Sequence, residues 1–217
     1  MNRRFCALLP LVFLAAGWTR AGEMKTFSFT ADDWAEGDVP KEVFVVDGTI
    51  KIAAKDGNKA VMIDPSPITD ASAQLGDSSS GSASIEARVF ASKKGRSQPR
   101  FGVSVHGMKG FRLIVNASRK QLELVKDEQV VKSAPFPWMT DTWTKLKLDV
   151  TKTGETQWTI TGKVWPAAEA EPKEAAIEHT DATLKGQGKC AIWGTPFSEM
   201  PIYFDDIRVA ISPAPGK

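Results

Sequence analysis

The sequence predicts an all-β protein, a two-sheet antiparallel sandwich of the jelly-roll kind. Short apolar runs recur along the chain, and those at residues 84–91 and 143–151 alternate between apolar and polar side chains. That two-residue period is typical of strands with one buried face. Turn residues separate the runs at short, regular intervals. The best helix candidate, residues 166–177, carries Pro172 in its middle and is expected to be a loop.

Size and composition are compatible with one domain. The chain has 217 residues, of which 42% are hydrophobic and 25% charged, close to the averages of globular proteins. All-β sandwiches of this length often form a single domain. We expect the sandwich to span residues 22–211 and to be followed by a flexible Pro/Gly tail at 212–217.

The first 21 residues have the pattern of a secretory signal peptide. Arg3 and Arg4 precede an apolar run at residues 5–17, and the small residues Thr19 and Ala21 occupy the two recognition positions for cleavage. The apolar run is too short to anchor the protein by spanning a bilayer. The pattern therefore predicts a secreted or periplasmic protein with no membrane anchor after cleavage.

Cleavage after Ala21, with Gly17 as the alternative position, also changes the charge. Removing Arg3, Arg4 and Arg20 subtracts three positive charges from the net charge of +2 and leaves −1. A domain so close to neutrality has no global electrostatic reason to bind nucleic acid or an anionic membrane. We therefore expect no nucleic-acid partner.

Neither cysteine is expected to form a disulfide within the mature chain. Cys6 belongs to the signal segment, which leaves Cys190 alone. Within Lys-Cys-Ala-Ile-Trp, Cys190 is expected to be a small buried hydrophobic residue of a strand. The fold should therefore depend on its core.

The expected strands follow one another closely. They cover residues 25–30, 43–46, 49–54, 59–64, 84–91, 100–106, 111–116, 121–126, 129–133, 143–151, 157–165, 188–193 and 202–211. Asp47-Gly48 is a hairpin-turn signal between the second and third strands, and the small polar residues of 66–84 predict a long loop. The expected core consists of apolar members of alternating strands: Leu146, Leu148, Val150, Trp158, Ile160, Ile207 and Val209, with Trp143 beside them.

A family resemblance appears in the second half of the chain. The closing strand reads Ile-Tyr-Phe-Asp-Asp-Ile-Arg-Val at 202–209, after Gly-Gln-Gly at 186–188 and Trp-Gly at 193–194; Trp-Thr-Lys-Leu-Lys-Leu-Asp-Val at 143–150 and Gly-Phe-Arg-Leu-Ile-Val at 110–115 lie upstream. In this order the segments resemble concanavalin A-like jelly rolls of the lectin/glucanase superfamily. They look most like laminin-G-like and 3-keto-disaccharide hydrolase-type domains of exported bacterial proteins. The resemblance implies a sandwich and a carbohydrate ligand, although its motifs are mostly structural.

The carboxylates of a glycoside hydrolase are not evident. Hydrolysis needs two of them across the scissile bond, and the glucanases of the superfamily carry Glu-x-Asp-x-x-Glu on one strand. The nearest strand here contributes only Glu86, with Arg88 on the same face, which is the pattern of an ion pair as much as of a ligand site. We assign no catalytic residue and keep a glycoside hydrolase as the alternative function.

Several residues are candidates for sugar binding, because indole rings stack on the apolar faces of sugars. Trp138 lies in a Pro-rich loop, and Trp165 and Trp193 lie at strand ends. His106 ends a strand beside a glycine, and Arg112, Glu86 and Arg88 are further candidates for polar contacts. For each tryptophan, plugging one end of the sandwich is the structural alternative.

Asp205 and Asp206 are the candidate metal ligands. Adjacent carboxylates in an apolar strand need cations or amide donors, and their oxygens suit Ca²⁺. The resemblance also implies a structural Ca²⁺ near such a closing Asp-Asp. The alternative is that one aspartate bonds to backbone amides while the other is solvated.

These observations predict an exported, non-catalytic carbohydrate-binding or surface-recognition module whose partner is a polysaccharide or oligosaccharide. A structural domain of the cell envelope is a second alternative, beside the hydrolase. Exposed aromatic residues gathered on one face would favour binding, paired carboxylates in a groove would favour hydrolysis, and a flat polar face would favour a structural role.

Overall fold

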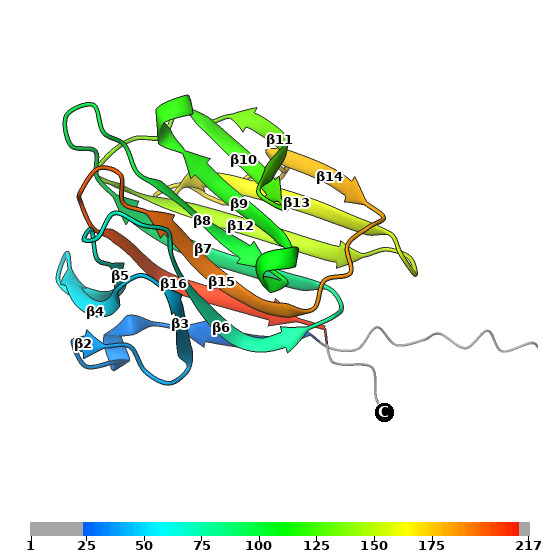
Figure 1. Ribbon diagram of the computed structural model, residues 1–217, viewed down its shortest axis with the longest axis horizontal. Coiled ribbons are helices and arrows are strands. Elements are labelled where there is room, and N and C mark those ends of the chain that lie inside the picture. The colour runs from blue at the N-terminus through cyan, green and yellow to red at the C-terminus, as the bar shows by residue number, and fades with distance from the viewer. Residues whose placement is uncertain (1–23, 213–217) are drawn as a thin grey trace, which may run out of the picture.

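A computed structural model describes residues 24–212 as two antiparallel β-sheets stacked face to face (Figure 1). Sheet A has nine strands. In spatial order they are β14 (Ile177–Asp181), β13 (Trp158–Pro166), β12 (Thr142–Lys152), β7 (Ala83–Ala91), β16 (Ile202–Ile211), β5 (Asn58–Ile63), β4 (Ile50–Lys55) and β2 (Gly37–Asp38), and β1 (Lys25–Phe29) also pairs with β16. The predicted two-sheet jelly-roll sandwich is therefore confirmed.

Sheet B has seven strands and forms the other layer. Its order is β11 (Gln129–Pro135), β10 (Gln121–Lys126), β9 (Phe111–Asn116), β8 (Arg100–Val105), β15 (Gly188–Thr195), β6 (Ala71–Ser79) and β3 (Val43–Asp47). The helices within residues 24–212 are three single 3₁₀ turns, η1 (Ala31–Asp33), η2 (Gly107–Lys109) and η3 (Ala117–Arg119). No helix in this part of the chain is long and apolar enough to cross a membrane.

The core lies between the sheets and contains the residues that the alternation predicts. Leu146, Leu148, Val150, Trp158, Ile160, Ile207 and Val209 all have exposed fractions of 3% or less. Cys190 is buried among them as expected, and burial raises the pKa of its thiol to about 12. A thiol so far from ionisation is chemically inert at neutral pH.

The turn at Asp47-Gly48 is not a hairpin, which corrects the sequence prediction. It carries the chain from sheet B to sheet A, since β3 pairs with β6 whereas β4 pairs with β5. Gly48 has a φ of 74°, and a Cβ there would lie 2.4 Å from the Cβ of Ala71. The glycine is required by this close crossing and not by a tight turn between partners.

The predicted loop at 66–84 contains a nine-residue strand, β6, which lies between β15 and β3. Ala71, Ala73 and Leu75 face the core, while Ser72 and Gln74 face outward. The alternation is present, but small side chains give it the composition of a loop. Of the loop expected at 166–177, residues 167–176 do form a loop, between β13 and β14.

Two side chains lie on the opposite face from the one expected. Trp143 is on the outer face of sheet A, because Leu146, Leu148 and Val150 set the inward positions of β12 at even numbers. Strict alternation along 202–209 would place Asp205 on the face of Ile207 and Val209, but it points away from them, because a bulge at Asp205–Asp206 shifts the register of β16 against β7. Asp206 takes the left-handed conformation there, with a φ of 48°.

Leu148→Ala is expected to lower the free energy of unfolding by about 2–5 kcal/mol, because it leaves a cavity at a fully buried site. Urea unfolding of both proteins measures the difference. Asp149→Ala, one position along on the outer face, is the control and should change stability by less than about 0.5 kcal/mol. Equal small losses in the two variants would contradict the assignment of faces.

Candidate functional site

The outer face of sheet B carries a row of side chains that crosses six strands. Residues paired across antiparallel strands point to the same side of a sheet, so the register alone aligns them. From β10 to β3 the row is Val125, Arg112, Ser104, Ala191, Gln74 and Phe44. At about 4.8 Å per strand this row is about 24 Å long, enough for a ligand of several sugar rings.

A groove of about 210 Å³ runs along this row. Gln74, Ser104 and Ser72 supply amide and hydroxyl groups to its floor, and the β8–β9 connection borders it through Gly107 and Gly110. Carboxylates line both ends, and Arg112 is the basic side chain that lines it. Such a mixture of donors and acceptors can bond to the hydroxyl groups of a sugar.

Trp193 forms the centre of the floor but is not an exposed stacking surface. It is 6% exposed and packs with Ile114 and Val125. The guanidinium carbons of Arg112 and Arg100 lie 4.9 and 5.5 Å from the centroid of its ring. The indole therefore holds two guanidinium groups by cation–π contacts.

Arg112 is held a second time, by a carboxylate. Its Nη2 donates to Oε1 of Glu128 at 2.6 Å. Glu128 and Asp127 form the β10–β11 turn, and both have positive φ. The arginine is thus fixed in orientation at one end of the groove.

The other end of the groove, at β3, carries apolar side chains beside its carboxylates. Phe44 and Val46 on the edge strand β3 are 60% and 47% exposed. Phe44 stands beside Gln74 in the row, and Val46 lines the groove itself. An exposed phenyl ring beside an amide suits the stacking of a sugar ring.

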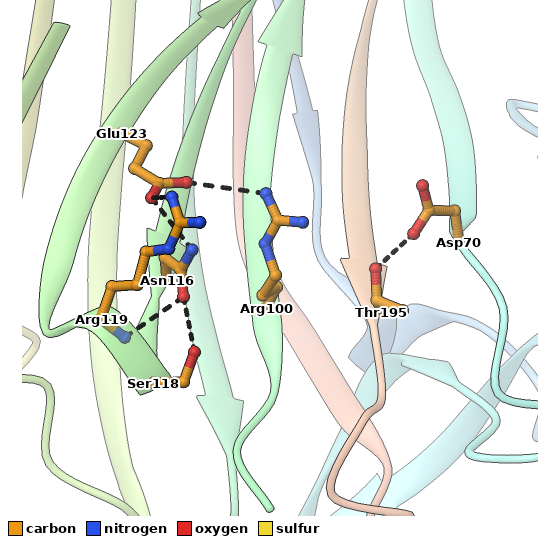
Figure 2. Close-up of polar contacts among 7 residues, drawn as sticks. All are labelled: Asp70, Arg100, Asn116, Ser118, Arg119, Glu123 and Thr195. Carbon is orange, nitrogen blue, oxygen red and sulfur yellow. Dashed lines mark hydrogen bonds and ion pairs between the residues drawn. The ribbon is translucent and has the colours of Figure 1, made fainter. Parts of the chain in front are cut away.

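A second polar cluster lies on the same face, in the next two rows (Figure 2). Glu123, 1% exposed, accepts a hydrogen bond of 2.9 Å from Nδ2 of Asn116, and Arg119 lies 3.4 Å from the same carboxylate oxygen. Arg100 lies 3.6 Å from the other oxygen of Glu123. These contacts balance the buried charge of Glu123.

Arg100 also stands between this cluster and the Thr195–Asp70 pair, as Figure 2 shows. It is paired in register with Asn116 on β9 and Thr195 on β15. The hydroxyl of Thr195 donates to the carboxylate of Asp70. The charges of Arg100 and Glu123 thus balance, although the buried Nε of Arg100 has no hydrogen-bond partner among the described residues.

The structure brings together two of the predicted ligand-binding residues, Trp193 and Arg112. Trp165 is 5% exposed and lies opposite Lys145 in sheet A. Trp138 packs edge-on against Phe101, 5.8 Å away. The expectation that these tryptophans form an exposed stacking surface is therefore wrong for Trp165 and Trp193, which are buried.

Glu86 and Arg88 lie on the outer face of sheet A, away from the groove. Glu86 is 3.5 Å from Lys145. Arg88 stacks on Trp143 at 4.5 Å, and its guanidinium approaches Asp205 at 2.5 Å and Asp206 at 3.1 Å. Both residues act in ion pairs, the alternative that their sequence pattern left open.

Asp205 and Asp206 do not fit a calcium site in this arrangement. Arg88 already supplies the positive charge that buried Asp205 requires, and Ca²⁺ takes six to eight oxygen ligands. Within residues 24–212 there is no group of three or more His, Cys, Asp or Glu side chains that could hold a metal ion.

His106 lies behind the groove and not in it. It is 1% exposed, and its ring contacts Trp158 edge-on at 5.5 Å. Its Nε2 lies 2.9 Å from the carbonyl oxygen of Gly81. A Cβ on Gly186 would come within 2.8 Å of the imidazole. Burial lowers the pKa of His106, against the opposing effect of the bond to Gly81.

Sequence analysis missed Phe44, Val46, Ser72, Gln74 and Ser104. The small polar residues of 66–84 predict a loop around Ser72 and Gln74. Phe44 precedes Asp47-Gly48, which predicts a hairpin that does not form. Only the strand order joins them to Arg112 and Trp193, and no local pattern reveals that order. The continuous apolar run Val-Phe-Val-Val at 43–46 does not show which of its side chains are exposed.

Comparison with known proteins gives the fold alone. No family model and no curated protein matches the chain. Among solved structures, the carbohydrate-binding module CBM66 from Bacillus subtilis is 14% identical with a TM-score of 0.53, and the match covers 77% of this chain and 94% of that one. The fold is a lectin-like jelly roll.

Two further structures show how widely this fold is used. A protein of unknown function with a galectin-like fold, also from Bacillus subtilis, is 11% identical, with a TM-score of 0.56 and coverage of 80% and 91%. The PL-14 alginate lyase from Aplysia kurodai is 12% identical, with a TM-score of 0.51 and coverage of 85% and 100%. Function must therefore be argued from the groove.

Chelation is expected to leave stability unchanged, because Arg88 already pairs with both closing aspartates and balances the charge of the buried one, Asp205. Thermal melts with EDTA and then with added Ca²⁺ measure this. A structural ion that binds only the native state would add about 2.7 kcal/mol at a hundredfold excess over its dissociation constant. If added Ca²⁺ raises the melting midpoint, the calcium site that the sequence suggests would be supported and the role given to Arg88 contradicted.

Acid is expected to destabilise the fold through His106. Its folded pKa lies below the ordinary value of 6.5, so below about pH 6.5 the unfolded chain binds a proton that the native chain does not. The free energy of unfolding therefore falls as the pH falls through this window, by at most about 1.4 kcal/mol per unit for one proton.

Urea unfolding between pH 7 and pH 5 measures this slope. His106→Asn, compatible with the positive φ at this position, should flatten it, whereas His179→Gln should not. The same slope in wild type and His106→Asn would contradict the assignment.

Proposed function

We propose that this protein is an exported carbohydrate-binding module whose ligand lies in the groove across sheet B. The observation that carries the proposal is the composition of the row of side chains along which the groove runs. It joins the fixed guanidinium of Arg112 and the amide of Gln74 to the exposed ring of Phe44, in one row on rigid strands. Rigid polar groups beside an apolar surface are what sugar recognition requires.

Two further facts support binding by this face. The lectin-like fold is shared with a carbohydrate-binding module of known structure. The outer face of sheet B is hollowed by a groove, whereas a purely structural envelope domain would be expected to present a flat polar face. Export rests on the signal-like residues 1–21, which lie outside the described part of the chain.

Hydrolysis is a second candidate, because two carboxylates share one end of the groove. Asp47 pairs with Ser72, two residues after Asp70 on the neighbouring strand, a diagonal relation in which Cα atoms lie about 7–8 Å apart. A glycosidase needs its two carboxyl groups roughly 5–9.5 Å apart, a separation that side chains on Cα atoms so placed can reach. Both side chains are exposed, however, and lack the apolar surroundings of a typical general acid. Binding is therefore the better supported function.

A glycan array on the protein, without its first 21 residues, is expected to identify an oligosaccharide ligand. Phe44→Ala should weaken its binding by roughly five- to tenfold through loss of stacking, and Gln74→Ala by a few-fold through loss of a hydrogen bond. Titration calorimetry on the array ligand measures both. New reducing ends on incubation would instead identify a hydrolase.

Phe197→Ala is the matched control for Phe44→Ala. Phe197 is also exposed, at 46%, and lies in the β15–β16 connection without lining the groove. Its removal should leave glycan binding unchanged. The proposal would be overturned by an array with no ligand, or by groove variants that bind like the parent.

A further inference from the structure

The charge of the groove is strongly one-sided. Asp47, Asp70, Asp127 and Glu128 line it, against the single guanidinium of Arg112. Four carboxylates and one guanidinium leave three negative charges in excess. Because clefts with low-dielectric walls concentrate such a field, the groove selects its ligand by charge.

The single guanidinium is not available to an anionic ligand. Arg112 is bound to Glu128 at 2.6 Å and stacked on Trp193, and its side chain is only 19% exposed. Arg100, two rows away, is committed to Glu123 and to the same indole. A ligand carboxylate would have to displace a carboxylate of the protein to reach either arginine.

The acidic side chains also occupy both ends of the groove. Asp47 and Asp70 lie at the β3–β6 end, and Asp127 and Glu128 form the turn at the β10 end. Asp47 accepts a hydrogen bond from the backbone amide of Gly48 at 2.8 Å. Within residues 24–212, Asp127 forms no salt bridge. A chain with a negative charge on every ring would meet repulsion wherever it lay.

We infer that the groove takes an uncharged, hydroxyl-rich oligosaccharide and excludes polyuronates. The inference rests on the proposed function and names its ligand class. Carboxylates accept hydrogen bonds from sugar hydroxyls, and Gln74, Ser72 and Ser104 donate and accept others. This selectivity separates the chain from the alginate lyase of the same fold, since alginate is a polyuronate.

The experiment compares two probes on four proteins. The probes are the best neutral oligosaccharide from the array and an alginate tetrasaccharide, titrated at about 50 mM and about 500 mM NaCl, since exposed charges are largely screened at the higher salt. The proteins are the parent, the groove variant Asp47→Asn/Asp127→Asn, the control Glu169→Gln/Glu174→Gln, and Phe44→Ala. Asparagine keeps an acceptor at 47 and suits the positive φ of residue 127.

The parent should bind the neutral probe equally at both salt concentrations and bind the tetrasaccharide weakly or not at all. The groove variant should bind the tetrasaccharide on the order of tenfold more tightly than the parent at low salt, with the neutral probe changed by less than about threefold. The control pair, which lies in the exposed β13–β14 loop, removes the same charge and should behave like the parent.

Two failures are distinguishable. If the parent binds the tetrasaccharide as tightly as the neutral probe, and Phe44→Ala weakens both, the groove is a glycan site but the charge selection is wrong. If the array yields no ligand of any charge, the proposed function is contradicted, and so is the inferred selection of uncharged oligosaccharides. If the control variant gains as much affinity for the tetrasaccharide as the groove variant does, the effect comes from net charge. That result would overturn the role of the groove carboxylates.

Discussion

The apolar layer between the two sheets determines where every other feature lies. Each strand gives alternate side chains to this layer, so that Leu146, Leu148 and Val150 leave Lys145, Lys147 and Asp149 on the outside. A slip of one residue would exchange the two sets, which makes the register very costly to change. The rows on the outer faces are thus consequences of the core, and the groove inherits the rigidity of the strands beneath it.

On the outer faces of both sheets, the charges of carboxylates are balanced by arginines that also contact an indole ring. On sheet A, Arg88 links Asp205 and Asp206 to the ring of Trp143. On sheet B, the ring of Trp193 contacts the guanidinium groups of Arg100 and Arg112. Arg100 also pairs with Glu123, and Arg112 with Glu128. In both places an indole supports a guanidinium whose charge is already balanced. Polar residues arranged in this way make a surface more rigid, and they also offer hydrogen-bonding groups to a ligand.

The compact strands and their inward faces were predictable from alternation, and Leu148 and Ile160 illustrate it. Alternation failed where side chains were small, as around Ala73 in β6, and where a bulge reversed the faces, as at Asp206. The groove was less predictable, because it depends on which strands are neighbours. Phe44 and Arg112 are 68 positions apart in the chain and lie in one row only through the order β3-β6-β15-β8-β9.

The closing strand β16 has two different neighbours along one edge. Residues 202–204 pair with β5, whereas residues 207–211 pair with β1, and the bulge at Asp205–Asp206 marks the exchange. Strand β1 thus pairs with the part of this edge of β16 that β5 leaves unpaired. A protein shortened to begin after Phe29 would present five unpaired residues of β16 as a template for another chain. Self-association through this edge would then compete with folding, and the core would also lose Phe29, although the groove had not been altered.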